Sequence, residues 1–433
     1  MLFSIKRSIT LLLLSLSLIL TGCSSSPAAI KKYEAQDIVQ KYDGDVEEFL
    51  NSEDYLKWLD EYGQSTEASV KLQKKMKHFY TSTLPVLLQA DTKKNMVYSP
   101  LNIFFALAML AECAGGETQK QILSLLGVSS TDELKEMVKT LMYANSVDNP
   151  VLASKLANSY WLSNEGNYKE DVLNTLVKDY YASSYIGDMK DGAYIKEMKK
   201  WLNEHTGDLL KDSVDGLTVD PATIMEIMSA IYYKASWNDG FTTKMTKTFH
   251  GANGDTDVEM MMRTGQMDYY ADPDFKAVMI PLSHSGSMYC FKVNKGTSIE
   301  DLTKNQKVID LINGSVKADY RRVELTVPKF DVDANIDLTD SLNTLGVVDA
   351  FTDQANFKPL TDDAVILSQA EHAARVTVDE QGVTGAAYTI FGIKESSIMI
   401  EDVPINFTLD EPFLFVVTGA DHSILFSGTI FDL

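Results

Sequence analysis

The change of apolar periodicity along the chain is the strongest constraint on its fold. Residues 68–87 carry apolar side chains at helical spacing, and a long apolar segment at residues 103–110 follows Ser99 and Pro100, with proline suited to the first turn of a helix. The later part carries short β-rich runs bounded by turn residues, at 277–281, 323–327 and 413–417. Helices early and strands late predict an α+β fold rather than alternating β-α units.

Size and charge limit the classes of partner. The chain has 433 residues, 45% of them hydrophobic, which is enough for a large core. Its 39 Lys and Arg stand against 61 Asp and Glu, for a formal net charge of -22. This charge repels nucleic acid phosphates, so we expect no nucleic acid partner.

The first residues predict export and a lipid anchor. Lys6 and Arg7 precede an apolar stretch at residues 9–20, which is too short to span a membrane as a helix. The sequence that follows, Leu-Thr-Gly-Cys at residues 20–23, looks like the site at which bacteria attach lipid to a cysteine. We therefore expect residues 1–22 to be a lipoprotein signal peptide, Cys23 to anchor the exported protein to the extracytoplasmic side of the membrane, and residues 23–67 to form a tether with a short helix.

Catalytic and metal-binding patterns are absent from the sequence. It has no G-x-S-x-G, H-E-x-x-H, phosphate-binding loop or dinucleotide fingerprint, and its six histidines are scattered singly. Cys113 and Cys290 lie in strongly apolar segments, so we expect buried free thiols, with a single disulfide between them as the alternative. The sequence thus predicts no enzyme, no metal and no cofactor.

Ordered sequence blocks from about residue 70 to the C-terminus resemble the serpin family of serine protease inhibitors. The blocks are NMVYSPLNI at 95–103, WLNEHTG at 201–207, AIYYKASW at 230–237, PKF at 328–330, EQG at 380–382, DEPFLF at 410–415 and LFSG at 425–428. The resemblance implies a serpin domain over residues 68–433, with three β-sheets, about nine helices and an exposed reactive-centre loop. It also implies a monomer whose partner is a target serine protease, held as a covalent acyl complex.

The hinge of the loop is suited to becoming a buried strand. In an inhibitory serpin, the cleaved loop enters the central sheet, so the hinge cannot contain proline or bury a charge. Odd-numbered positions from Val383 to Ile393 share the face that would turn inward, and Lys394 falls on the outward set. The hinge residues are Glu380, Gly382, Val383, Thr384, Gly385, Ala386 and Ala387.

The position of the scissile bond depends on the direction of counting. Counting forward from Glu380 places it between Ser396 and Ser397, whereas counting back from Pro412 places it near Glu401. We favour the forward count because the hinge-to-bond distance sets how far the protease is carried. The window comprises Ile393, Lys394, Glu395, Ser396, Ser397, Ile398, Met399 and Ile400. Its small and apolar residues favour elastase-like or subtilisin-like targets, while Lys394 would suit a trypsin-like and Glu395 a glutamyl-specific protease.

The resemblance also places a polar cluster beneath the central sheet, which controls whether its strands can separate. Its members here, in the family's shutter and breach regions, are Ser99, Asn102, Ser229, Trp237 and His372. The family pattern has serine where Asn102 stands and asparagine where Ser229 stands. We therefore expect Asn102, Ser229 and His372 to form one hydrogen-bonded cluster with two roles exchanged.

Two functions remain open at this point. The uncharged, proline-free hinge favours a suicide-type inhibitor. The alternative is a non-inhibitory serpin that acts as a lipid-anchored binding or carrier protein, because a fold alone does not establish inhibition.

Overall fold

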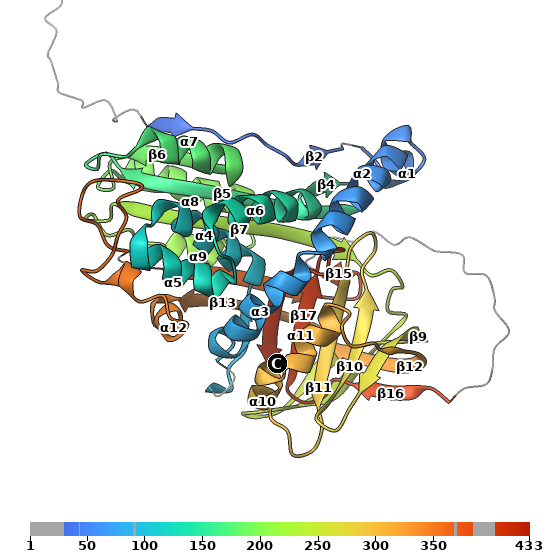
Figure 1. Ribbon diagram of the computed structural model, residues 1–433. Helices are drawn as coiled ribbons and strands as arrows, with labels where there is room; N and C mark the ends of the chain where they lie inside the picture. Colours follow the sequence, from blue (N-terminus) through green and yellow to red (C-terminus); the bar gives the residue numbers. More distant parts are fainter. Residues whose placement is uncertain (1–29, 43, 90–91, 368–369, 384–402) are drawn as a thin grey trace, which may run out of the picture.

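The computed structural model describes residues 30–42, 44–89, 92–367, 370–383 and 403–433. In this part of the chain the strands form two hydrogen-bonded sheets of nine strands each, here called sheet A and sheet B, with helices packed around them (Figure 1). The mixed α and β architecture confirms the predicted fold class.

Sheet A has the strand order β1-β6-β5-β7-β15-β14-β13, with β2 and β4 attached beside β5. Its strands are β1 Lys31–Tyr33, β2 Gln40–Lys41, β4 Val147–Asn149, β5 Leu152–Ser163, β6 Ala182–Gly187, β7 Met225–Ser236, β13 Phe330–Asp337, β14 Glu371–Val378 and β15 Gly382–Val383.

Sheet B has the order β16-β12-β9-β10-β11-β17-β18-β3, with β8 paired to β9. Its strands are β3 Met96–Tyr98, β8 Thr243–Gly251, β9 Gly254–Ala271, β10 Phe275–Pro281, β11 Ser287–Val293, β12 Asp319–Pro328, β16 Ile405–Thr408, β17 Phe413–Thr418 and β18 Ile424–Ile430. The expected second and third sheets are joined by hydrogen bonds, because the 18-residue β9 pairs with β8, β12 and β10 along its length.

Twelve α-helices and a 3-10 helix lie among the described residues, more than the expected nine. They are α1 Val46–Leu50, α2 Glu53–Val70, α3 Gln73–Leu87, α4 Pro100–Cys113, α5 Gly116–Leu126, α6 Thr131–Asn145, α7 Glu170–Asp179, α8 Gly192–Thr206, α9 Lys211–Gly216, α10 Ile299–Lys304, α11 Gln306–Ile312, α12 Thr339–Thr344 and η2 Asp349–Phe351.

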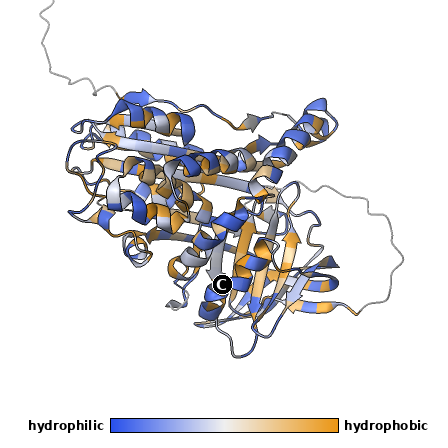
Figure 2. Ribbon diagram, in the orientation of Figure 1, coloured by the Kyte–Doolittle hydropathy of each residue, from blue (hydrophilic) through white to orange (hydrophobic). Residues whose placement is uncertain are grey.

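Helix α4 forms the centre of the core. Pro100 occupies its first turn, and the Ser99 hydroxyl caps it by accepting the N–H of Asn102 at 3.3 Å. Nearly all of its side chains are buried against β7, β18 and neighbouring helices. Hydrophobic residues are likewise concentrated in the central strands of sheet B (Figure 2). Cys113 and Cys290 are buried free thiols, as predicted.

The segment after residue 30 differs from the expected tether. Strand β1 pairs with β6 and forms the edge of sheet A, and helix α2 packs against α6 (Figure 1). Trp58 of α2 is 1% exposed and stacks on Tyr62 with ring centroids 5.2 Å apart. Aromatic side chains at helical spacing give this polar segment one apolar face, which explains why it folds onto the body of the protein.

Candidate functional site

The seam of sheet A lies between β7 and β14. At one end these parallel strands are joined by the two-residue strand β15, which pairs antiparallel with both. Among the described residues no backbone pairing links β7 directly to β14 below that point. The seam is therefore a place where a further strand can pair on both sides.

Strand β15 contains the start of the predicted hinge. Val383 is fully buried and lies opposite both Ala235 of β7 and Val378 of β14, in agreement with its predicted inward direction. A Cβ at Gly382 would overlap the carbonyl oxygen of Ala235. Close approach of two backbones, not a special backbone angle, is thus the reason for glycine at this position.

Glu380 holds the hinge by charge. Its carboxylate pairs with Lys329 at 2.6 Å and with Lys244, and both lysines also pair with Glu259. Hydrogen bonds from the ammonium groups of Lys244 and Lys329 lower the pKa of Glu380 to about 2. The carboxylate therefore stays ionised at neutral pH and fixes the chain immediately before β15.

Trp237 fixes the same segment by hydrogen bonds. The buried indole N–H donates to the carbonyl of Asp379 at 2.8 Å, and the backbone N–H of Trp237 donates to the carbonyl of Gln381 at 3.0 Å. Trp237 and Glu380 thus both hold the turn at residues 379–381.

The polar cluster beneath the seam has different bonds from those predicted. Nε2 of His372 accepts the backbone N–H of Ser99 at 2.9 Å, and burial lowers the pKa of His372 to about 4, which keeps the ring neutral. Nδ2 of Asn102 donates to the backbone carbonyl of Ser229 at 3.3 Å. The predicted side-chain link from Asn102 to Ser229 or His372 is therefore wrong, because the strand backbone, not the hydroxyl, faces the amide.

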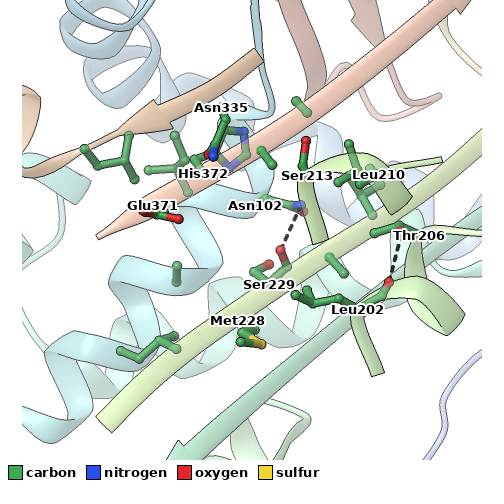
Figure 3. Close-up of a pocket in the computed structure, with 18 of the residues that line it drawn as sticks. Asn102, Leu202, Thr206, Leu210, Ser213, Met228, Ser229, Asn335, Glu371 and His372 are labelled. Atoms are coloured by element: carbon green, nitrogen blue, oxygen red, sulfur yellow. Dashed lines mark hydrogen bonds between the residues drawn. The ribbon is translucent and has the colours of Figure 1, made fainter. Parts of the chain in front are cut away.

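Two polar atoms at this cluster lack partners. Oδ1 of Asn102 and Oγ of Ser229 are buried without a hydrogen bond to any described residue. Both residues line a cavity of about 180 Å³ at the seam, as His372 does (Figure 3). Buried polar atoms without partners cost free energy, so each requires an explanation such as an ordered water, an ion or another bound group.

Glu226 and Glu371 also line this cavity and were not predicted from the sequence. They lie near the beginning of β7 and at the beginning of β14. Burial, together with the nearby carboxylate of Glu371, raises the pKa of Glu226 to about 7. In the sequence each is a single acidic residue on an alternating strand, and nothing there shows that both line one cavity with residues of α8 and α9.

Other predicted site residues lie outside the described part of the chain. They are Thr384, Gly385, Ala386 and Ala387 of the hinge, all eight residues of the scissile window, and the lipid-anchor residue Cys23. Within the described ranges, no group of three or more His, Cys, Asp or Glu is placed to hold a metal ion, and no helix is long and apolar enough to cross a membrane.

Comparison with known proteins defines the class. The family model for serpins (serine protease inhibitors) matches residues 74–433, so the chain belongs to the serpin family. It is 28% identical over 361 residues to a serine protease inhibitor of Cyanea capillata, covering 79% of this chain and 94% of the relative. Serpins are in general protease inhibitors rather than catalysts.

Solved structures share the fold. The native state of the thermophilic serpin tengpin superposes with a TM-score of 0.74 at 23% identity, covering 84% of this chain and 94% of tengpin. The complex of thyroxine-binding globulin with thyroxine has a TM-score of 0.69 at 22% identity, covering 83% and 99%. At this identity the likeness concerns the fold alone.

Proposed function

We propose that this serpin is a suicide-type inhibitor of serine proteases that inserts its cleaved loop into the seam of sheet A. The observation that carries the proposal is β15, whose described residues already pair with both β7 and β14 at one end of a seam that is otherwise unpaired among the described residues. In the proposed reaction the target's serine Oγ attacks the scissile carbonyl and forms an ester, and the amine end of the loop leaves with the proton. Insertion then removes the ester from attack by water.

The register of β15 supports the predicted faces of the loop. Gly382 lies opposite Ser236 and Val383 opposite Ala235. If the inserted strand kept this register, Ala387 would lie opposite Ile231 and Thr389 opposite Ser229. Ile231 and Ala235 belong to the main core, so the odd-numbered loop residues would face inward.

The target class follows from the scissile window. With the bond between Ser396 and Ser397, small neighbouring side chains fit elastase-like or subtilisin-like proteases. Cleavage after Lys394 or Glu395 would instead indicate a trypsin-like or glutamyl-specific target. Mass spectrometry of the released C-terminal fragment distinguishes these bonds.

A gel experiment tests the inhibitory mechanism. The chain is incubated separately with elastase-like, subtilisin-like and trypsin-like proteases and then run under denaturing conditions. We expect a higher band that contains inhibitor and protease joined covalently, for at least one protease. Cleavage by every protease without a higher band would overturn the inhibitory mechanism.

We further propose that the protein is an exported lipoprotein anchored through Cys23 at the cell envelope. The apolar segment at residues 9–20 and the Leu-Thr-Gly-Cys sequence support this location. Cys23→Ala should release the protein from membranes or leave it unprocessed, since the thioether needs that sulfur. Normal processing with unchanged membrane partition would contradict the proposal.

A lipid-anchored carrier is the second candidate. The buried polar atoms in the seam cavity and the shared fold of thyroxine-binding globulin favour it. A carrier would bind a ligand saturably, and cleavage of its loop would not raise its thermal stability. A large rise in stability after cleavage would instead support insertion.

A further inference from the structure

Strand β1 lies at the end of sheet A that an inserted loop would reach. In the strand register Lys31 of β1 lies opposite Ile186 of β6. Ile186 lies opposite Leu162 of β5, which lies opposite Met225, the first residue of β7. In the register of β15, Ile393 would join this row beside Met225, just before the favoured scissile bond. A protease joined to the cleaved loop would therefore come to lie at this end of the sheet, here called the β1 end, about 19 Å from β1 across the strands.

The proposed lipid anchor is attached at the same end. Residues 24–30 connect Cys23 to β1 and span at most about 25 Å when fully extended. A protease domain of about 220 residues has a radius of gyration of about 17 Å, and therefore a diameter of about 45 Å. The trapped protease and the membrane thus compete for the space next to β1.

The segment that carries β1 and β2 is held only by peripheral contacts. It comprises residues 30–42, here called the N-terminal arm, and none of its described side chains is buried. Lys31 pairs with Glu170 at 3.1 Å, with both side chains more than half exposed, and the hydroxyl of Tyr33 donates to the same carboxylate at 3.1 Å. Exposed ion pairs of this kind contribute little to stability.

The helices that follow the arm are held firmly. Phe49 of α1 and Trp58 of α2 are buried in the main core. The hydroxyl of Ser69, at the end of α2, donates to the buried carboxylate of Asp421 at 2.5 Å. Between the arm and these helices stands Gly44, whose φ of 132° favours glycine. The arm can therefore detach while α1 and α2 stay docked.

Strand β2 lies at the other end of sheet A (Figure 1). Gln40 lies opposite Val147, and Val147 opposite Ser154. Ser154 lies opposite Tyr233, which is about 26 Å along β7 from Met225. Detachment of the arm therefore moves the point at which the chain leaves the folded body from the β1 end to the opposite end.

We propose that the N-terminal arm is a releasable spacer, which detaches when the trapped protease reaches the β1 end. The proposal rests on the proposed inhibitory function and on the lipid anchor at Cys23. With the arm docked, the connection to the membrane spans at most about 25 Å, which is less than the diameter of the protease. With the arm released, residues 24–44 span up to about 75 Å, and the protease fits beside the membrane.

Amide hydrogen exchange on the uncleaved chain tests release without any protease. We expect the amides of residues 31–42 to exchange at least about 100-fold faster than those of residues 55–69 in α2, because the arm opens while the helix stays docked. Equal protection of the two segments would show that the arm does not open separately, and would overturn the proposal.

A disulfide lock tests the role of release at a membrane. Tyr33→Cys with Ser184→Cys joins β1 to β6 at opposite positions, and Lys32→Cys with Tyr185→Cys is the second lock. Adjacent antiparallel pairs alternate between wide and narrow spacing, so one of the two suits a disulfide. The chain that begins at Cys23 keeps every described residue and is coupled through that thiol to a maleimide lipid in phosphatidylcholine vesicles.

The measurement is the covalent complex formed with a protease that the unlocked chain traps in solution. On vesicles, we expect the locked chain to form at least about fivefold less complex than the unlocked chain, and prior reduction of the lock to restore it. The locked chain in solution is the control and should form as much complex as the unlocked one, because no membrane limits the protease there.

Three outcomes would reject the spacer. Equal complex on vesicles with and without the lock would show that release is not needed. An equal loss in solution would show that the lock impairs insertion itself. If the unlocked chain formed no covalent complex with any protease in solution, the inhibitory function would fail and the spacer role with it, whereas complexes in solution combined with either of the first two outcomes would reject the spacer alone.

Discussion

The backbone N–H of Ser99 donates to Nε2 of His372 over 2.9 Å, and this bond joins the start of α4 to β14. The acceptor must be a neutral imidazole, because a protonated ring has no free lone pair. Burial keeps the imidazole neutral, because it lowers the pKa of His372 to about 4. The bond therefore links the seam of sheet A to the protonation state of one residue.

His372→Phe should destabilise the uncleaved chain by about 1–3 kcal/mol, because it leaves the buried N–H of Ser99 without an acceptor. The measurement is the urea midpoint at pH 7. His78→Phe, at an exposed position of α3, is the matched control.

The same substitution should change the response to acid. The folded-state pKa of His372 lies below the ordinary value of 6.5, so its contribution to stability is present above pH 6.5 and is lost as the pH falls toward 4. His372→Phe should make the decline over this window shallower. If the variant lost stability between pH 6.5 and pH 4 as steeply as the wild type, another group would control this loss.

Glu226 should produce a pH dependence of the opposite sign. Its folded-state pKa is raised from 4.5 to about 7, so the stability it contributes is present below pH 4.5 and is lost as the pH rises through 7. Thermal unfolding at pH 6 and pH 8 should show a decrease in the wild type and a smaller decrease in Glu226→Gln. Parallel curves for the two proteins would contradict a titration of Glu226 in this range.

The sequence predicted which residues lie at the seam, but not which hydrogen bonds they make there. Family blocks identified Ser99, Asn102, Ser229 and His372 as neighbours, and all four lie at the seam. The exchange of side-chain roles failed because it depends on whether a strand presents a carbonyl or a hydroxyl to Asn102. That choice is set by the packing of whole elements against one another, which residue spacing in the sequence does not contain.

Two further features required the folded structure for the same reason. Glu226 alternates with apolar neighbours and is typical of a solvated strand residue, but α8 packs over β7 next to it. The segment around Trp58 was polar enough to suggest a tether, although its aromatic residues cover a neighbouring loop at His284. In both cases burial depends on a segment that is distant in the sequence: α8 for the strand that carries Glu226, and the loop at His284 for Trp58.

The buried direction of Val383 leads to a test of the loop's two faces. If the protein is an inhibitor, Ala387→Asp should convert it into a substrate, because an unpaired charge buried in the sheet costs several kcal/mol and slows insertion. Val383→Arg should do the same and should also destabilise the uncleaved chain, because Val383 is already buried there. Thr384→Arg, on the outward face, is the control and should be milder. The measurement is the ratio of covalent complex to cleaved chain on a denaturing gel. Equal ratios for all three variants would disprove the face assignment.

Oδ1 of Asn102 and Oγ of Ser229, which lack partners in the uncleaved chain, should gain a partner when the cleaved loop inserts. In the register of β15, Thr389 would lie opposite Ser229 and face inward, next to Oδ1 of Asn102. A threonine hydroxyl can donate to one atom and accept from the other. Satisfying these atoms should stabilise the inserted form by about 1–3 kcal/mol, whereas the uncleaved form keeps them unpaired.

Thr389→Val has nearly the shape of threonine but no hydroxyl, so it should lower the guanidinium midpoint of the cleaved form and leave that of the uncleaved form unchanged. Thr389→Ser keeps the hydroxyl and should recover most of the loss. A valine variant whose cleaved form is as stable as the wild type would place Thr389 away from Ser229 and exclude this register. A valine variant that lowers both midpoints equally would exclude it as well, because the hydroxyl would then be needed before insertion.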